Sequence, residues 1–259
     1  MPTAAEARAL YTDSYFLGGE GGGYADYAAD EPLHRVNARD RLVVLDGAWP
    51  APPGALLDVG CAFGYFLDEA RAKGWEVAGV EVAVGPAEQA RRQLGLEVHA
   101  DLEDLLPTGR GRFDVVTLFQ VLAHVVDPGA TLTTVHELLR PGGVLIVESP
   151  DAGSRVARLL GRHWHLATPP SIVTMFDVDS LDRLLRRCGF TRRLKRRTSK
   201  TVSVGFVAGV LAHKYPRLSR PLAGVERRPA LAARGVRYSL GDVMTVIAER
   251  TGEGGEPGS

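Results

Sequence analysis

One stretch constrains the fold of this chain more than any other: it runs from Leu56 to Leu67 and reads LLDVGCAFGYFL. A β-rich apolar run stops at Gly60, and a helical pattern of apolar residues begins at about Gly64. The stretch therefore predicts a strand, a tight glycine loop and a helix. Glycine at these two positions lets the backbone approach a ligand closely, and the helix directs its first N–H groups toward the loop. This is the nucleotide-binding half of an α/β fold.

The spacing around the loop indicates what kind of nucleotide is bound. A pyrophosphate-binding loop has the spacing G-x-G-x-x-G, whereas this chain has G-x-x-x-G with Asp58 two residues before the first glycine. A carboxylate at that position disfavours a phosphate and favours a cation. The second predicted strand ends in Glu81, 21 positions after Gly60, where an acid can accept both hydroxyls of a ribose. We therefore expect a nucleoside without a bridging phosphate, and the spacing opposes an NAD(P)-dependent oxidoreductase.

Strands and helices alternate along the central part of the chain. The patterns predict strands at 55–59, 76–81, 96–100, 113–118 and 144–148, and helices at 64–73, 86–94, 128–140 and 177–188. Short connections between such elements are typical of a parallel sheet with right-handed crossovers. Ligands bind at the carboxyl ends of the strands in such sheets, so the segment after residue 118 is expected to line the site.

Further motifs follow in order between about residues 50 and 150, reading ADL at 100–102, FDVV at 113–116, VLAHV at 121–125, DP at 127–128 and LRPGG at 139–143. Together with the glycine loop and Glu81, they make the chain resemble the class I S-adenosylmethionine-dependent methyltransferases. The resemblance implies a Rossmann-like, doubly wound α/β fold whose seven-stranded sheet is mostly parallel with one antiparallel strand. It also implies S-adenosylmethionine as the cofactor.

The resemblance implies a set of cofactor-binding residues along these motifs. In the family, an acid at Asp101 hydrogen-bonds the adenine amino group and the next backbone N–H reads a ring nitrogen; the alternative for Asp101 is an N-cap of the following helix. Phe119 and Gln120 follow the fourth strand and are expected to line the floor between methyl donor and acceptor. The complete set is Asp58, Gly60, Cys61, Ala62, Gly64, Tyr65, Phe66, Glu81, Val82, Asp101, Leu102, Phe119 and Gln120.

Three histidines are the candidate catalytic residues: His124, His163 and His165. A base is needed only where the acceptor must lose a proton, as an alcohol or phenol does. His124 lies in the turn after the fourth strand, where a histidine is also commonly a structural hydrogen-bonding residue. Relatives carry a histidine shortly after the prolines at 169–170, but this chain has Ser171-Ile172-Val173, so that function is absent or has moved to His163 or His165. His-x-His without a third ligand nearby does not predict a metal site.

The composition is that of a globular protein with an uneven charge distribution. With 259 residues, 45% of them apolar, the chain is long enough for one α/β domain and a small appendage. Residues 1–130 contain 20 acids and 10 bases, and residues 131–259 contain 11 acids and 21 bases. An acidic half suits a sulfonium cofactor, and a basic half can attract an anionic acceptor; alternatively, the arginines solvate exposed helices.

Two cysteines, Cys61 and Cys188, are too few for a disulfide framework, and the first residues carry no signal-peptide pattern. The longest apolar stretch, near residues 202–212, is too short to span a bilayer. The sequence therefore predicts a cytoplasmic protein without a membrane partner.

Nine basic residues between Arg183 and Lys200 fit a charged edge strand. An RNA-binding surface is the alternative. No aromatic residues alternate with these basic residues, so we do not expect the protein to bind nucleic acid.

Five segments are expected. Residues 1–49, rich in tyrosine and glycine, form a lid and a helix, or pack over the sheet edge; residues 50–200 form the cofactor-binding core. Residues 201–235 form a helical insertion with an apolar helix from Val202, which shapes the acceptor site or a homodimer contact. Residues 236–250 supply the last strand, and residues 251–259 form a disordered tail.

The function expected from these patterns is O-methylation of a small molecule in secondary metabolism or glycan biosynthesis. N- or C-methylation of a small molecule and methylation of RNA or protein are the enzymatic alternatives. A different class remains open as well, that of a catalytically silent subunit that binds the cofactor and activates a partner through the insertion.

Overall fold

The computed structural model describes residues 27, 30–167, 172–214, 224–225 and 227–251. Most of the expected N-terminal lid, and all but Thr251 of the expected disordered tail, lie outside these residues. Within the described residues, no helix is both long and apolar enough to cross a membrane.

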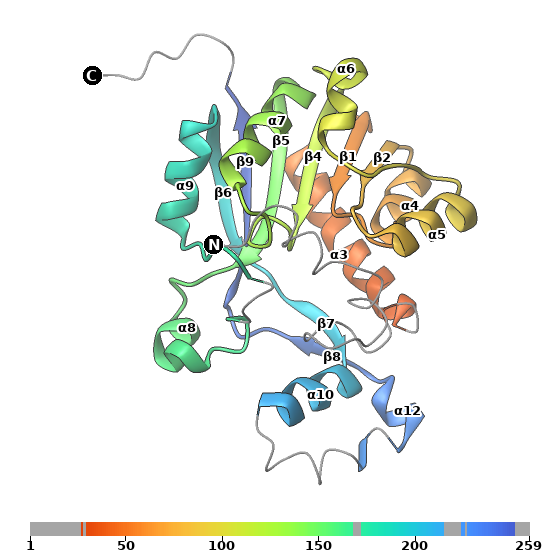
Figure 1. Ribbon diagram of the computed structural model, residues 1–259, viewed down its shortest axis with the longest axis vertical. Coiled ribbons are helices and arrows are strands. Elements are labelled where there is room, and N and C mark those ends of the chain that lie inside the picture. Colours follow the sequence, from red (N-terminus) through yellow and green to blue (C-terminus); the bar gives the residue numbers. More distant parts are fainter. Residues whose placement is uncertain (1–26, 28–29, 168–171, 215–223, 226, 252–259) are drawn as a thin grey trace.

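A seven-stranded sheet forms the centre of the molecule (Figure 1), with the strand order β3-β2-β1-β4-β5-β9-β6. Strand β9 runs antiparallel to both of its neighbours, and the other described pairs in this sheet are parallel. The predicted fold class is therefore confirmed. The strands are β1 (Ala55–Val59), β2 (Glu76–Val80), β3 (Glu97–His99), β4 (Phe113–Phe119), β5 (Leu139–Pro150), β6 (Phe190–Arg197) and β9 (Val243–Arg250).

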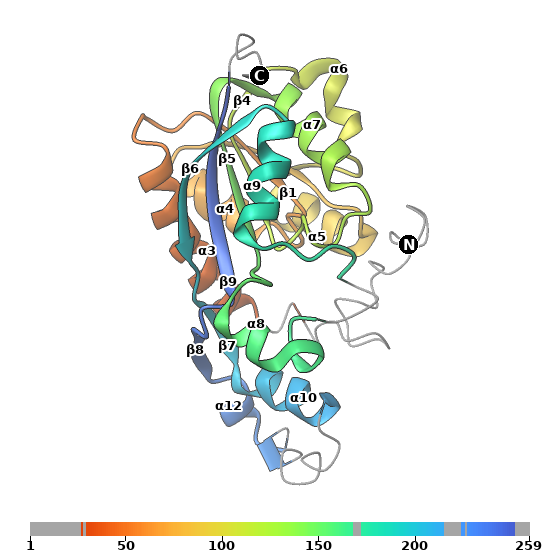
Figure 2. The same ribbon diagram turned by 90° about the vertical axis from the view of Figure 1, so that its left-hand side faces the viewer.

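Helices cover both faces of the sheet, as the edge-on view in Figure 2 shows. One apolar core joins a sheet face to α3 (Glu31–Ala48), α4 (Tyr65–Ala72) and α5 (Val84–Leu94). The other core joins the opposite face to η1 (Glu103–Leu105), α6 (Leu106–Gly109), α7 (Pro128–Leu138) and α9 (Val178–Arg187). Because both faces are buried, the central strands are continuous apolar runs rather than alternating ones.

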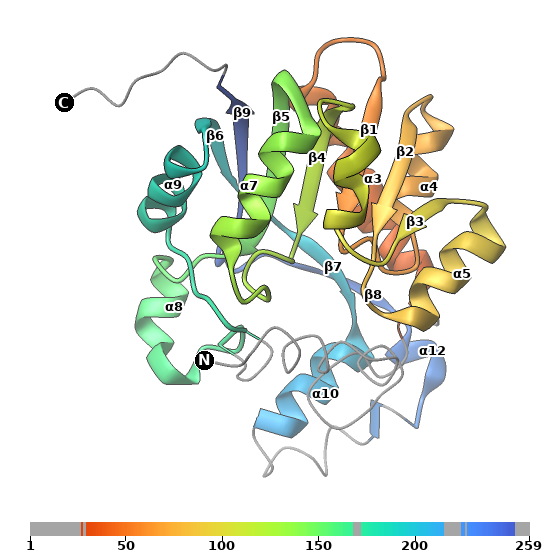
Figure 3. The ribbon, with the colours of Figure 1, turned by 45° about the horizontal axis from the view of Figure 1, so that its top comes forward.

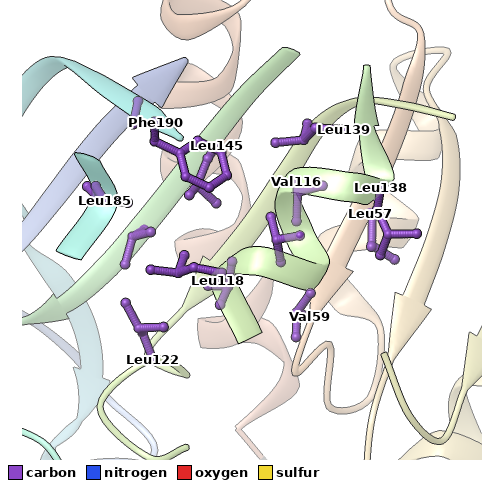
Figure 4. Close-up of a cluster of buried hydrophobic side chains, with 14 of the residues drawn as sticks. Leu57, Val59, Val116, Leu118, Leu122, Leu138, Leu139, Leu145, Leu185 and Phe190 are labelled. Carbon is purple, nitrogen blue, oxygen red and sulfur yellow. The ribbon is translucent and has the colours of Figure 1, made fainter. Parts of the chain in front are cut away.

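Figure 4 shows the second core, in which side chains of the sheet meet those of the helices on one of its faces. Val116 and Leu118 of β4 and Leu145 of β5 are fully buried and lie beside Leu138 of α7 and Leu185 of α9. Helix α9 begins with a capping box in which Asp177 and Ser180 bond each other's backbone N–H groups. The amphipathic pattern predicted for this helix is confirmed, and it places Leu185 against the sheet.

A smaller unit follows β6 and lies below the carboxyl edge of the sheet (Figures 1 and 3). It comprises β7 (Lys200–Ser203), α10 (Val204–Lys214), α12 (Pro229–Ala232) and β8 (Gly235–Tyr238), and β7 pairs with β8 in an antiparallel ribbon. The apolar helix expected from Val202 therefore begins two residues later. The β-branched residues Thr201 and Val202 favour a strand, and the Asn37 side chain bonds both the N–H and the carbonyl of Thr201, which holds the strand against α3.

The segment between β5 and α9 lies beside this unit. It contains α8 (Arg155–Leu160) and a 3-10 turn, η2 (Gly161–His163), and Figure 3 places α8 at the same end of the molecule as α10. Ser154 caps α8 by accepting the N–H of Ala157. This segment carries two of the three candidate histidines.

Candidate cofactor site

The backbone of the loop between β1 and α4 has the left-handed conformation that favours glycine. Gly60, Ala62 and Gly64 have φ values of 75°, 48° and 77°. A Cβ on Gly60 would overlap the side chain of Val121, and a Cβ on Gly64 would overlap that of Leu96. The loop is held against the second strand because the N–H groups of residues 60 and 61 both donate to the carbonyl of Val80, at 2.7 and 3.0 Å. The result is a tight turn whose backbone can lie close to a ligand.

Glu81 lies directly after β2, beside this loop, and only 6% of its surface is exposed. Its two carboxylate oxygens accept the N–H groups of Ala62 at 2.8 Å and Ala83 at 2.9 Å. Burial raises the pKa of Glu81, although these backbone hydrogen bonds act in the opposite direction. The backbone N–H of Val82 also bonds this carboxylate, so of its roughly four acceptor positions one remains for a ribose hydroxyl. Its chemistry fits a nucleoside.

Asp58 is the second buried acid of the site, with 4% of its surface exposed. The Thr117 hydroxyl donates to its Oδ1 at 2.6 Å. Burial raises the pKa of Asp58 to about 7, against the opposing effects of Thr117 and Arg41, and the nearby carboxylates of Glu81 and Glu148 add to the rise. A cationic ligand would favour ionisation of this acid, and the pair of acids would in turn favour such a ligand.

The predicted adenine contacts lie at the ends of the two neighbouring strands. Asp101 follows β3 and is partly exposed, Leu102 is buried, and Val82 is 42% exposed. The N-cap position of the next helical turn, η1, is Leu102 rather than Asp101. Leu102 itself has helical backbone angles, so Asp101 directly precedes this turn, and both interpretations of Asp101, an adenine contact and a cap of the turn, stay predictions.

The side chains of the loop have different surroundings. Cys61 packs toward Gly79 of β2, where an added Cβ would overlap its Sγ, and burial raises the pKa of its thiol well above the usual value. Tyr65 is buried in a set of nearly parallel rings with Tyr27 and His34, of which the last two are stacked at 3.7 Å. Tyr27 belongs to the aromatic segment predicted to form a lid. Its stacking places that part of the segment beside the loop.

The residues predicted to form the floor of the site, Phe119 and Gln120, lie at the end of β4. Phe119 packs edge-to-face against Phe66 at 4.9 Å, and the guanidinium of Arg41 lies over its ring at 4.3 Å. Gln120 has a φ of 61° and donates both its backbone N–H and its side-chain Nε2 to Glu148, the latter at 3.1 Å. This strained backbone is held by two hydrogen bonds, a pattern common where a side chain must face a ligand.

Glu148 is the centre of an ionic cluster that the sequence patterns did not reveal. Its carboxylate is 2% exposed and lies 3.0 Å from Arg41 and 3.7 Å from the Nζ of Lys200. Burial works against ionisation, but these two cations hold the pKa of Glu148 below its usual value. The same cations, after burial itself, lower the pKa of His34 to about 4. The three charged residues are 52 or more positions apart, so no local spacing could have indicated them.

The three candidate histidines lie in different surroundings. His124 is partly exposed in the turn after β4, and the preceding carbonyl of Ala123 accepts the N–H groups of Val173 and Thr174, which ties segment 172–174 to this turn. His163 is exposed and accepts a hydrogen bond from Arg162 at 3.3 Å. His165 lies 2.5 Å from the hydroxyl of Tyr238 and 3.6 Å from Asp242. Within the described residues, no group of His, Cys, Asp and Glu is arranged to hold a metal ion.

The parallel strands, the glycine loop and the two buried acids define a Rossmann-like domain that binds a nucleoside at its carboxyl edge. The family model described as "Methyltransferase domain" matches residues 29–193. The chain therefore belongs to the class I S-adenosylmethionine-dependent methyltransferase family, whose cofactor is S-adenosylmethionine. The loop, Glu81 and Asp58 fit that cofactor, since they combine close backbone approach, a ribose acceptor and negative charge.

Curated relatives and solved structures agree with this family. A ubiquinone biosynthesis O-methyltransferase of Aromatoleum aromaticum is 34% identical over 119 residues, which are 44% of this chain and 50% of that protein. The enzyme of the same name from Psychrobacter arcticus is 31% identical over 157 residues, covering 53% and 59%. The chain thus spans about half the length of the curated relatives it matches. The fold is shared with a Mesorhizobium loti S-adenosylmethionine-dependent methyltransferase, at a TM-score of 0.54, 22% identity and coverage of 80% and 96%.

Proposed function

We propose that the protein transfers the methyl group of S-adenosylmethionine to a hydroxyl of a small, phenol-like acceptor. The observation that carries the cofactor part is the pair of buried acids, Asp58 and Glu81, on either side of a loop with left-handed backbone. O-methylation is supported by the names of the relatives and by histidines at the carboxyl edge. A place in secondary metabolism or glycan biosynthesis is part of the proposal.

The residues described above would have separate functions in such a reaction. The cofactor, when bound, supplies an electrophilic methyl group on a positively charged sulfur. Glu81 would hold the ribose, Asp101 and Leu102 the adenine, and the loop at 60–64 the remainder of the nucleoside. Phe119 and Gln120 would form the floor against which the acceptor is oriented. Catalysis would come mainly from holding acceptor oxygen and methyl carbon about 3 Å apart in a site with little water.

An anionic acceptor is part of the proposal, because Arg41 and Lys200 both lie beside the single carboxylate of Glu148. Asp58 and Asp242 also interact with these two cations, so the proposal depends on the position of the two cations and not on an excess of positive charge. The basic residues of β6 offer less support for RNA binding. Three of them are paired with acids: Arg192 with Asp182, Arg193 with Glu249 and Lys195 with Asp151.

Two measurements test the proposal. Isothermal titration with S-adenosylmethionine should show saturable binding by the purified protein, and incubation with methyl-labelled cofactor should label phenols in a panel of phenols, sugars, amines and RNA. Labelling of amines or RNA instead of phenols would contradict the O-methylation proposal. Binding without label transfer to any class would favour the silent subunit, a candidate that the replacement of the family histidine by Ser171-Ile172-Val173 keeps open.

Location and assembly complete the proposal. We place the reaction in the cytoplasm, where the unpaired thiols of Cys61 and Cys188 would stay reduced. We also propose a homodimer through the unit formed by β7, α10, α12 and β8. Cell fractionation and light scattering test these two points, and a monomer in solution would contradict the second.

A further inference from the structure

Two segments far apart in the sequence, at 164–165 and 238–242, meet at the carboxylate of Asp242, which is fully buried. The indole Nε1 of Trp164 donates to its Oδ2 at 2.8 Å, and the hydroxyl of Tyr238 lies 2.9 and 3.0 Å from its two oxygens. The same hydroxyl lies 2.5 Å from Nε2 of His165, whose side chain is 24% exposed. A buried acid is thus connected through one phenol to a partly exposed histidine.

The arrangement determines which atom of His165 carries a proton. Burial and the hydrogen bond to Asp242 raise the pKa of Tyr238 above its usual value, so its hydroxyl stays protonated. That hydroxyl has one proton, and the carboxylate of Asp242, which cannot donate, takes it. The oxygen of Tyr238 can then only accept from His165, which requires the proton on Nε2. In the neutral imidazole, the basic lone pair is therefore on Nδ1.

The network lies at the carboxyl edge of the sheet, beside the floor of the cofactor site. Asp242 immediately precedes β9, whose first residue pairs with the last residue of β5, and its carbonyl accepts the N–H of Asp151 at 2.8 Å. Tyr238 is the cross-strand partner of Lys200 in the β7–β8 ribbon. Lys200 in turn reaches Glu148, to which Gln120 of the floor is bonded. In Figure 3, β8 lies under this edge.

We infer that His165 is the general base of the acceptor site and that Tyr238 and Asp242 are its positioning residues. This inference rests on the proposed O-methylation. Nδ1 of His165 removes the proton of the acceptor hydroxyl as an oxygen lone pair forms the bond to the methyl carbon. The carbon–sulfur bond breaks, and its electron pair stays on sulfur, which becomes a neutral thioether. Asp242 stabilises the imidazolium through Tyr238 until the proton passes to water.

The charged groups around His165 agree with this role. Asp242 supplies the negative charge that favours the imidazolium, and Lys200, on the neighbouring strand, interacts with that carboxylate. Arg162 lies three positions before His165 and is bonded to His163. Because burial keeps water from Asp242, its effect on His165 is transmitted through one hydrogen-bonded hydroxyl rather than screened by solvent.

Kinetics of four variants test the role. With a phenol that the wild type methylates, His165→Gln should lower kcat by about 100-fold or more, as loss of a general base does. Tyr238→Phe and Asp242→Asn should lower kcat about tenfold with little change in KM, and should move the acidic limb of the kcat profile to lower pH, because the imidazolium loses its support. Leu240→Ala, an exposed residue between the two, is the matched control and should keep the wild-type profile.

A merely structural network would give a different result. Tyr238→Phe and Asp242→Asn would then lower thermal stability or raise KM while the acidic limb stayed at its wild-type pH, and that outcome would overturn the inference. Nitrogen-15 NMR of the histidine rings tests the tautomer in the protein without an acceptor. The wild type should show His165 protonated at Nε2, and protonation at Nδ1 would overturn the inference. If the wild type methylates no phenol, the proposed function fails, and the base role fails with it.

Discussion

The two sides of the carboxyl edge are built in different ways. On the cofactor side, the residues predicted to bind the nucleoside come from the ends of β1, β2, β3 and β4, and Glu81 among them is held by backbone N–H groups. On the proposed acceptor side, side chains from distant segments hold one another, as Trp164 holds Asp242 and Arg41 holds Glu148. Cofactor binding is therefore encoded in short local motifs. The acceptor side depends on contacts that exist only in the folded protein.

The two sides also differ in charge. Asp58 and Glu81 place two buried acids beside the glycine loop, while Glu148 is shared by the cations Arg41 and Lys200. The two buried acids would attract a positively charged methyl donor, and the two cations would attract a negatively charged acceptor.

Glu148→Gln should destabilise the acceptor side most. The substitution leaves Arg41 and Lys200 without their shared carboxylate, and removing one partner of a buried ion pair costs about 3 to 5 kcal/mol. Denaturant unfolding measures this loss. Glu76→Gln, at an exposed salt bridge to Arg112 at the other end of the sheet, is the control and should change the free energy of unfolding by less than about 1 kcal/mol. Equal losses of unfolding free energy in the two variants would contradict a stabilising role for the cluster of Glu148, Arg41 and Lys200.

Gly64→Ala should destabilise the cofactor side through packing as well as backbone strain. Gly64 and Gly95 both have left-handed backbone, with φ of 77° and 62°, but a Cβ would overlap Leu96 only at the first position. Gly95→Ala should therefore cost about 1 kcal/mol and Gly64→Ala about 1 to 3 kcal/mol more. Thermal denaturation of the two variants compares them. A larger loss at Gly95 would contradict the packing of this loop.

Asp58 should make the unliganded protein less stable as the pH rises. Its pKa is about 7 in the folded state, above the usual value of 3.8 for an aspartate, so the folded protein binds more protons between these values. Its contribution is fully present below the lower value and is lost as the pH rises through the higher one. Between about pH 5 and pH 7, the wild type should lose about 2 kcal/mol relative to Asp58→Asn. Parallel curves for the two proteins would contradict the raised pKa.

Arg193→Ala should have the smallest effect, because the pair it forms with Glu249 is largely exposed on the edge strand β6. Exposed pairs contribute about 0 to 1 kcal/mol. We expect neither the affinity for S-adenosylmethionine nor the free energy of unfolding to change by more than about 0.5 kcal/mol. A loss of acceptor turnover in this variant would place the basic strand in the acceptor site instead.

The sequence predicts the cofactor side of the molecule better than the acceptor side. The strand at 55–59 is found with its predicted bounds, and the other elements predicted between residues 64 and 119 begin and end within two residues of their predicted positions, because apolar period, glycine and capping residues act locally. The helical turns η1 and α6 were not predicted, and β5 begins at Leu139 and not at the predicted residue 144. The β7–β8 ribbon was not predicted, since strand pairing across 30 residues leaves no local pattern. Arg41, Tyr238 and Asp242 were missed for the same reason. None of the three lies in a recognisable motif, and each contacts its partners only in the folded protein.

The most direct test of the account is the affinity for S-adenosylmethionine of the double variant Asp58→Asn, Glu81→Gln, measured by isothermal titration. Both substitutions keep the shape of the side chains and remove the negative charge. The account predicts an affinity at least about 100-fold weaker than that of the wild type, from the loss of two charge-assisted interactions, while circular dichroism shows a folded protein. An affinity equal to that of the wild type would contradict the claim that two buried acids select a positively charged nucleoside.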